Sequence, residues 1–432
     1  MVKSVTPAGR LSGHRLGKVA RARVLLCLAV GLPATIVAGW QILHRVPGLA
    51  PWAADTLRSI VGVDAVARLE EFAYRIEDRV LTLVRRGEQP RAYWRVPPEA
   101  TPPNAAPAPS GPGRGAEGAD PALPAPELLD AALSSAVPFH LASVGPMHAG
   151  WAAPGDGAWV PLPEGTDPRD ARMFKTLLHP DRKRGWAELF VVALDLRRVR
   201  MHLVPGTREP QATVTEALDI PRLGRVPDEH HAGVLAAFNG GFKTEHGHYG
   251  MFVNGVTLVP PHQQTCTVAY FKDHTLRIGS WPTLQDQLDE VAWWRQTPNC
   301  MFEGGRMHPR LADGYVHKWG STLGGETVIR RSAIGIDASG HTLFVGISNH
   351  TTAPAIASGM RHAGALTVAQ LDINFSYPKF VTFRASRLSK LRFAVPLARG
   401  FEFSEHEYLR KPSYRDFFYV MDAAADGRTA RN

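Results

Sequence analysis

The chain has 432 residues, of which 44% are apolar and 21% charged, as is usual for a globular protein with more than one structural unit. Its net charge is +9, but six Lys and Arg residues lie in residues 1–23, which contain no acid. Because the excess positive charge is concentrated in this tail, the composition argues against a nucleic-acid partner.

An uncharged run of twenty residues, 24–43, follows the basic tail. As a helix, this run is long enough to cross about 30 Å of hydrocarbon, with Pro33 as a kink. The basic flank predicts that residues 1–23 are cytoplasmic. We therefore expect an uncleaved, single-pass signal-anchor in the inner (cytoplasmic) membrane, with the rest of the chain on the periplasmic or extracellular side. A cleaved signal peptide is the alternative, although the run is long for one and lacks an evident A-x-A site.

The next segment predicts an amphipathic juxtamembrane helix within 47–90. Apolar residues recur at three- and four-residue steps across 55–86, for example Leu69, Phe72 and Ile76, with charges between them. Three partners for this apolar face stay open: the membrane surface, a second copy of the chain (self-association through 55–86), or the folded domain.

A linker is expected after this helix. Ten prolines within 97–126, with few large apolar side chains, predict an extended Pro/Ala/Gly-rich spacer over 97–127. Residues 128–425 then form the main domain, with its core at about 185–400.

The main domain shows short strands and turns, which predict an α+β fold with a mostly antiparallel sheet and flanking helices. Asn254-Gly255 between two short apolar runs is the strongest hairpin signal. The predicted strands are 187–194, 199–204, 234–238, 251–253, 256–259, 267–271, 275–278, 328–337, 342–348 and 367–372, and a helix is predicted at 353–363.

Three cysteines are present: Cys27 in the predicted anchor, Cys266 and Cys300. In an oxidising compartment the last two form a candidate disulfide, and two free thiols are the alternative.

The first candidate for chemistry is Asn239-Gly240-Gly241, which follows an apolar strand. Glycines permit close backbone approach and positive φ, so their amide N–H groups can converge on an anion, and the Asn239 amide both donates and accepts. A structural tight turn is the alternative.

Two charged residues extend the candidate site. Asp372 lies at the C-terminal end of the predicted buried strand 367–372, where the backbone is held while the side chain meets solvent, and a loop-capping aspartate is the alternative. Arg331 begins another apolar strand and has the geometry to clamp a phosphate, or is a solvated strand end. His246, His248 and the pair His230-His231 match no known metal-ligand spacing, so we expect no metal and no cofactor.

In this order, the stretches AAFNGGF, GMFVNGV, RRSAIGIDASGHTLFVGIS and a strand ending in LD resemble the phosphodiester glycosidase family, over roughly 185–400. Members of this family include enzymes that remove N-acetylglucosamine from a phosphodiester on mannose. The resemblance matches Asn239, Gly240 and Gly241 to the family's Asn-Gly-Gly, Gly250 and Asn254-Gly255 to the following Gly and Asn-Gly, and Arg331 to the arginine before the Ile-Gly strand.

One segment departs from the family pattern. Where the family has Leu-Asp-Gly-Gly-Gly-Ser-Ser, this chain has Leu-Asp-Ile-Asn-Phe-Ser-Tyr from Leu371 to Tyr377. Ile373 and Phe375 do not adopt positive φ readily and fill space near a ligand. Asn374 and Ser376 supply polar groups in a remodelled pocket.

The resemblance implies a membrane-anchored exported hydrolase that acts on a sugar phosphodiester in envelope glycan or exopolysaccharide. The expected catalytic residues are Asp372 as the base or as the group that orients the sugar, with Arg331 and Asn239 at the phosphate. The expected substrate-binding residues are Gly240, Gly241, Asn374 and Ser376. The alternative is a catalytically inactive member of the same fold that binds glycan or scaffolds an envelope complex.

Overall fold

The computed structural model describes residues 61–96, 139–313, 328–386 and 391–429, together with Leu49, Ala53, Thr56, Leu57, Ile60 and Trp319. The predicted anchor and the predicted linker lie outside these residues. Within them, no helix is both long and apolar enough to cross a membrane. Contacts between Cα atoms divide the chain into two units, Met1–Val66 and Ala67–Asn432.

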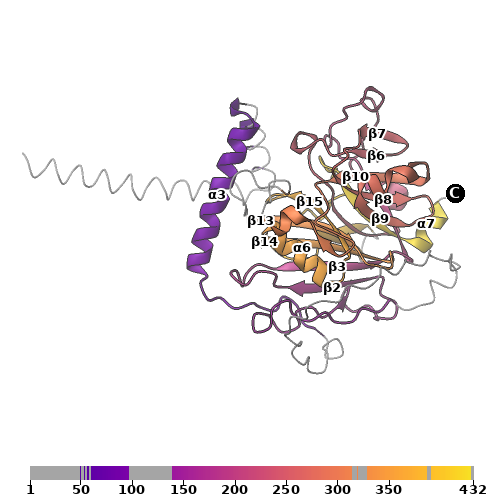
Figure 1. Ribbon diagram of the computed structural model, residues 1–432. Coiled ribbons are helices and arrows are strands. Elements are labelled where there is room, and N and C mark those ends of the chain that lie inside the picture. Colours follow the sequence, from indigo (N-terminus) through magenta and orange to yellow (C-terminus); the bar gives the residue numbers. More distant parts are fainter. Residues whose placement is uncertain are drawn as a thin grey trace, which may run out of the picture. The chain divides into compact units, whose positions relative to one another are not determined.

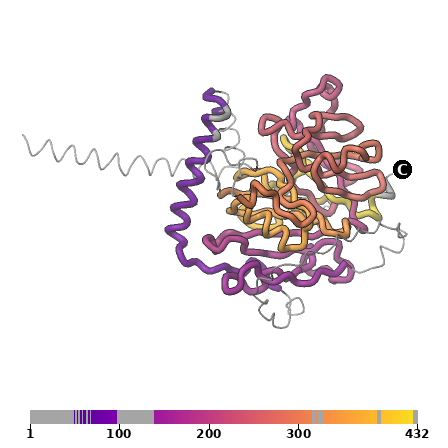
Figure 2. The backbone as a smooth tube through the Cα atoms, in the orientation of Figure 1, coloured from indigo at the N-terminus to yellow at the C-terminus, as the bar shows by residue number. Residues whose placement is uncertain are grey.

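The largest sheet has eight strands, and every pairing in it is antiparallel. Its strands, in spatial order, are β1 (Val160–Pro161), β2 (Met173–Leu178), β3 (Leu189–Asp195), β14 (Thr342–Thr351), β13 (Ile329–Ile336), β15 (Thr367–Ile373), β11 (Phe302–Glu303) and β12 (Arg306–Met307). Segments far apart in sequence meet here, since β3 lies directly beside β14 (Figure 2).

Both faces of this sheet are buried, which explains why nearly every residue of β3 is apolar. Phe190, Val192 and Leu194 belong to the main hydrophobic core, whereas Leu189 and Val191 belong to a second core on the other face. The second core includes α6 (Ala353–His362), whose first turn is capped by the Thr352 hydroxyl accepting from the Ala355 N–H at 3.3 Å. Figure 1 shows α6 against β3, β13 and β14.

Two five-stranded antiparallel sheets complete the domain (Figure 1). One consists, in spatial order, of β7 (Val256–Val259), β6 (Met251–Val253), β10 (Val291–Thr297), β8 (Cys266–Phe271) and β9 (Leu276–Ser280). The other consists of β17 (Arg392–Pro396), β16 (Phe380–Ala385), β5 (Val234–Asn239), β18 (Phe417–Asp422) and β4 (Val199–Val204). Side chains from all three sheets enter the main core.

Helices are few among the described residues. The α-helices are α3 (Val63–Val84), α5 (Pro309–Ala312), α6 and α7 (Ala423–Thr429), and the short 3-10 helices are Thr215–Ala217, Asp228–His230, Thr244–His246, Trp281–Thr283 and Gln285–Glu290. The mostly antiparallel α+β prediction is therefore confirmed for this part of the chain. Helix α3 lies inside the predicted amphipathic segment.

Local predictions also agree with the structure. Asn254 and Gly255 have φ values of 55° and 78°, as a type I′ hairpin requires. Cys266 and Cys300 form a disulfide, with their Cα atoms 4.7 Å apart, which settles the alternative left open by the sequence. This bond joins the start of β8 to the segment after β10.

Candidate functional site

A β-bulge positions Asp372 at the end of β15. Arg331 pairs with Ile373 and Ala333 pairs with Gln370, so Ser332 alone faces both Leu371 and Asp372. The Ser332 hydroxyl donates to the Asp372 carbonyl at 2.8 Å and fixes this extra residue. In a regular strand, residues two apart point to the same face of the sheet, so Gln370 and Asp372 would have the same neighbours. The bulge lets their side chains contact different groups.

The Asp372 carboxylate is buried, with 2% of the residue exposed, and faces a cation. Its Oδ2 lies 2.6 Å from Arg415 Nη2, and its Oδ1 accepts from the Ile373 N–H at 2.9 Å. Burial raises the pKa of Asp372 to about 6, helped by the neighbouring Asp416 carboxylate, although Arg415 and the Ile373 N–H lower it. A carboxyl group with this pKa changes its protonation state just below neutral pH.

Arg415 is the cation of this group and is equally buried, with 4% exposed. Burial alone would lower its pKa, but the carboxylates of Asp372 and Asp416 raise it, so the guanidinium stays charged. The Tyr377 ring lies over the guanidinium, with 4.3 Å between Cζ and the ring centroid. Arg415 Nε and Nη2 have no aligned hydrogen-bond acceptor among the described residues, so the contact with Asp372 is an ion pair with poor hydrogen-bond direction. Buried donors in this state are uncommon in folded proteins.

The Asn-Gly-Gly turn wraps around Asp416. The Gly240 N–H donates to the Asp416 carbonyl at 2.9 Å, and the Gly241 N–H donates to Asp416 Oδ2 at 3.0 Å. A Cβ on Gly240 would lie 2.3 Å from that same oxygen, so close approach is what requires glycine here. Both amides are therefore bonded to Asp416, the Gly240 N–H to its main-chain carbonyl and the Gly241 N–H to its carboxylate.

Arg295 completes the shell around Asp416. It is fully buried in β10, and its Nε donates to Asp416 Oδ2 at 2.9 Å, while its other N–H groups donate to the carbonyls of Tyr249, Phe242 and Gln296. A Cβ on Gly241 would lie 2.9 Å from Arg295 Cζ. The second oxygen of Asp416, Oδ1, has no hydrogen-bond partner among the described residues.

Asn239 connects this shell to the bulge. Its Nδ2 donates to Ser332 Oγ at 2.8 Å, and its Oδ1 accepts from the Lys379 N–H at 3.1 Å. In addition, the Asp372 N–H donates to the Gly240 carbonyl at 3.1 Å. The structure thus brings Asn239, Gly240, Gly241 and Asp372 together with Arg415, Asp416 and Arg295. We call this set of seven residues the Asp372 cluster.

Arg331 has a different set of partners. It is buried, with 1% exposed, and donates to the Thr351 carbonyl, to the Trp319 carbonyl and to Gln370 Oε1 at 3.2, 2.7 and 3.1 Å. These three groups lie outside the Asp372 cluster. Burial lowers the pKa of Arg331 to about 9. The phosphate role that the resemblance implies for Arg331 stays a prediction, and these contacts describe an arginine that ties strands β14 and β15 together.

The segment that departs from the family pattern folds as a turn beside the cluster. Asn374 Oδ1 accepts from the N–H groups of Ser376 and Tyr377, which is an Asx turn, and its Nδ2 lies 3.4 Å from Asp372 Oδ2. The Ser376 hydroxyl donates to Glu402 Oε1 at 2.9 Å. The Phe375 ring packs on Arg330, with 3.8 Å from Cζ to its centroid, so of the two aromatic residues it is Tyr377 that covers Arg415. Asn374 therefore reaches Asp372, whereas Ser376 bonds elsewhere.

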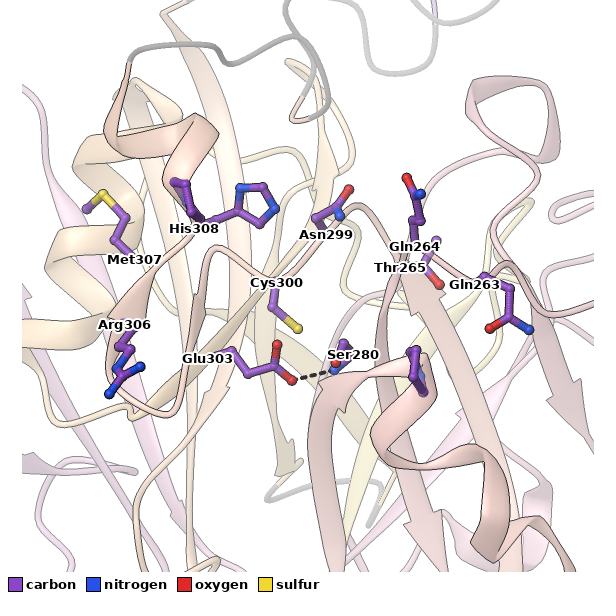
Figure 3. Close-up of a pocket in the computed structure, with 12 residues that line it drawn as sticks. Gln263, Gln264, Thr265, Ser280, Asn299, Cys300, Glu303, Arg306, Met307 and His308 are labelled. Carbon is purple, nitrogen blue, oxygen red and sulfur yellow. Dashed lines mark hydrogen bonds between the residues drawn. The ribbon is translucent and has the colours of Figure 1, made fainter. Parts of the chain in front are cut away.

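An open pocket of about 420 Å³ is separate in its lining from the Asp372 cluster. It lies beside the disulfide, and its walls are Gln263, Gln264, Thr265, Ser280, Pro282, Asn299, Cys300, Glu303, Arg306, Met307, His308 and Pro309. Figure 3 shows Glu303 accepting from the Ser280 N–H, a contact of 2.7 Å that joins the two sides of the pocket. None of the predicted site residues lines it.

No three His, Cys, Asp or Glu side chains within the described segments are arranged to hold a metal ion.

Sequence reasoning missed three charged members of the cluster. Arg295 carried a signal, because a charge inside the apolar strand VAWWRQT has to be buried with a partner. Arg415 and Asp416 stand directly before β18, an apolar strand of the kind that made Asp372 a candidate. Nothing in their local sequence indicates that β18 lies beside β5.

Comparison with known proteins finds only weak similarity, and only among solved structures. No family model and no curated protein matches the chain. Among solved structures, the zebrafish N-acetylglucosamine-1-phosphodiester alpha-N-acetylglucosaminidase catalytic domain, auto-inhibited by its pro-peptide, is 15% identical over 61% of this chain and 86% of that chain, with a TM-score of 0.37.

Two further structures are similar at lower scores. A hypothetical protein from Synechocystis is 9% identical over 58% of this chain and 62% of that chain, with a TM-score of 0.34. A putative exported protein from Burkholderia pseudomallei is 9% identical over 54% and 74%, with a TM-score of 0.24. Because all three TM-scores are below 0.5, we take neither fold nor activity from these proteins.

Proposed function

We propose that this chain is an exported, membrane-anchored hydrolase that cleaves a sugar phosphodiester, and that the Asp372 cluster is its active site. One observation carries the proposal: Asp372, a buried carboxyl with a pKa of about 6, is in contact with Arg415, a buried guanidinium that has two unaligned donors. Perturbed ionisable groups and unsatisfied buried donors gather at functional sites more often than in structural cores.

The proposed reaction uses Asp372 as general base. Asp372 in its ionised form takes a proton from water, the water oxygen bonds to the anomeric carbon, and the bond from that carbon to the phosphate oxygen breaks. The electron pair of the broken bond leaves on the phosphomonoester, whose charge Arg415 stabilises through Nε and Nη2. The proton passes from Asp372 to solvent or to the released phosphate.

In this proposal the Asn-Gly-Gly turn positions other groups and does not bind the substrate directly. Gly241 and Arg295 fix Asp416, and Asn239 fixes the bulge through Ser332. The sugar lies on the Asn374 side of Asp372, where the amide Nδ2 is 3.4 Å from the carboxylate.

A second candidate function is favoured by Tyr377. Its half-buried ring covers Arg415, and Asp372 and Arg415 are both nearly inaccessible to solvent. A substrate has to displace this ring, whereas a catalytically inactive member that binds glycan or scaffolds an envelope complex has no such requirement.

The experiment that separates the two is turnover of a synthetic N-acetylglucosamine-1-phosphodiester by the full chain, beside Asp372→Asn and Arg415→Lys. The proposal expects release of N-acetylglucosamine by the wild type and loss of that release in both variants. Folded wild-type protein that binds the diester without turnover would make the inactive binding member the better account.

A further inference from the structure

We propose that the exposed apolar face of α3 is a self-association surface whose partner is the same face of a second copy of this chain, with the two helices parallel. Five large apolar side chains make up this face: Leu69, Phe72, Ile76, Val80 and Leu83. We call them the α3 stripe.

The α3 stripe is strongly exposed in the single chain. The exposed fractions run from 45% for Ile76 to 73% for Leu83. Leu69, Ile76 and Leu83 recur every seven residues, with Phe72 between the first two, which is the spacing of helices that pack along their length. A contiguous apolar face of this kind on a folded chain marks an interaction site.

The opposite side of the helix is already used by the chain's own domain. Asp78 Oδ2 lies 2.6 Å from Arg184 Nη2, and Asp78 Oδ1 lies 3.2 Å from His350 Nε2. Residues two apart on an α-helix differ by about 200°, so Asp78 points away from Ile76 and Val80. The domain therefore holds α3 with the α3 stripe turned outward (α3 is the long indigo helix of Figure 1).

The charges beside the α3 stripe indicate which partner fits. With about 100° per residue, Arg68, Arg75 and Arg79 form one edge of the stripe, and Glu70 and Glu77 lie along the other. In a parallel pair each edge meets the opposite edge of the partner, so arginines face glutamates on both sides. In an antiparallel pair arginines would face arginines. Arg75 also pairs with Glu71 of its own helix at 2.8 Å, which leaves the remaining donors of its guanidinium for this edge.

The same charges argue against a lipid surface as the occupant. A helix that lies on an anionic bilayer has a polar face rich in Lys and Arg. Here the described part of the helix places Glu70, Glu71, Glu77 and Asp78 among its arginines. A second copy matches this alternation of charge, and the 22 residues of α3 span about three heptads.

Site-specific disulfide crosslinking of the full chain in detergent tests the proposal, in a Cys27→Ser background that leaves the Cys266–Cys300 bond intact. Leu69→Cys and Leu83→Cys are each expected to form covalent dimers with themselves, because parallel helices bring equal residues together. Arg85→Cys is the matched exposed control off the stripe and is expected to crosslink at least tenfold more slowly.

A second measurement keeps the result interpretable. Ile76→Glu is expected to convert the dimer to a monomer in sedimentation, without loss of the domain's thermal unfolding transition. Crosslinking only between Leu69→Cys and Leu83→Cys chains in a mixture would show an antiparallel pair and overturn the proposal. A monomer at all concentrations, or equal crosslinking of Leu69→Cys, Leu83→Cys and Arg85→Cys, would overturn it as well.

Discussion

Arg331 and Arg415 are both buried arginines next to β15, and they differ in what surrounds them. Arg331 donates to the oxygens of Thr351, Trp319 and Gln370, and burial lowers its pKa to about 9. Arg415 faces two carboxylates, which raise its pKa, and two of its donor groups stay unaligned. The comparison teaches that two arginines of equal burial differ in electrostatic setting, since Arg331 is bonded to neutral oxygens, whereas Arg415 lies beside acids and has two donors without an aligned acceptor among the described residues.

The largest expected effect is on the base. Asp372→Asn keeps the size of the side chain but cannot take a proton, so the rate of phosphodiester hydrolysis is expected to fall about 10²–10⁴-fold. Steady-state kinetics on the N-acetylglucosamine diester measure this fall, and circular dichroism checks that the variant is folded. A variant that retains full turnover would remove Asp372 from the mechanism.

The next largest effect is expected to differ between Arg415 and Arg331. Arg415→Lys loses the planar donors and is expected to lower kcat/KM by about 10–100-fold, the equivalent of about 1.5–3 kcal/mol for hydrogen bonds to charge. Arg331→Lys is expected to leave kcat/KM nearly unchanged and to lower the free energy of unfolding by about 1–3 kcal/mol. Kinetics and denaturant unfolding on both variants measure the contrast, and the reverse pattern would return the phosphate to Arg331.

The pH dependence of stability gives a third test. The pKa of Asp372 in the folded protein, about 6, is above the ordinary aspartate value of 3.8, so the folded protein binds this proton more tightly than the unfolded chain does. The stabilisation from this group is complete below pH 3.8 and is lost as the pH rises through 6. The unfolding free energy of wild type relative to Asp372→Asn is expected to fall by about 1–3 kcal/mol from pH 4 to pH 7. A rise over that range would mean that the ion pair with Arg415 outweighs burial.

The smallest expected effect concerns the ring over Arg415. Tyr377→Ser removes a cation–π contact worth about 0.5–2 kcal/mol of stability and opens the guanidinium to substrate, so KM is expected to fall. Phe375→Ser is the matched control, because it removes the equivalent contact with Arg330 at 3.8 Å. If both variants change KM alike, Tyr377 is not the cover of the site.

Much of the fold could be predicted from local sequence, because alternation and turn chemistry are local. Asn254-Gly255 predicted its hairpin, and the boundaries of β15 and α6 were close to those observed. The site could be predicted only in part. Asn239 and Asp372 lie at the ends of strands that the sequence predicts. Arg415 and Arg295 join them through the pairing of β5 with β18 and through β10, which are contacts between distant segments.

The bulge shows why even a correct list of residues does not give a correct site. By the alternation of β15, the side chains of Gln370 and Asp372 are expected on the same face of the sheet. The bulge opposite Ser332 is what gives the two side chains different partners. Likewise, the glycines of the Asn-Gly-Gly turn correctly predicted a close approach, but nothing in the local sequence indicates that the approaching group is Asp416.

The most direct measurement is a crystal structure of the full-length Asp372→Asn variant with an N-acetylglucosamine-1-phosphodiester bound. The account predicts a phosphate oxygen within hydrogen-bond distance of Arg415 Nε or Nη2, with the Tyr377 ring displaced and the anomeric carbon next to residue 372. Phosphate bound at Arg331, or the ligand seated in the pocket beside the Cys266–Cys300 disulfide, would contradict it.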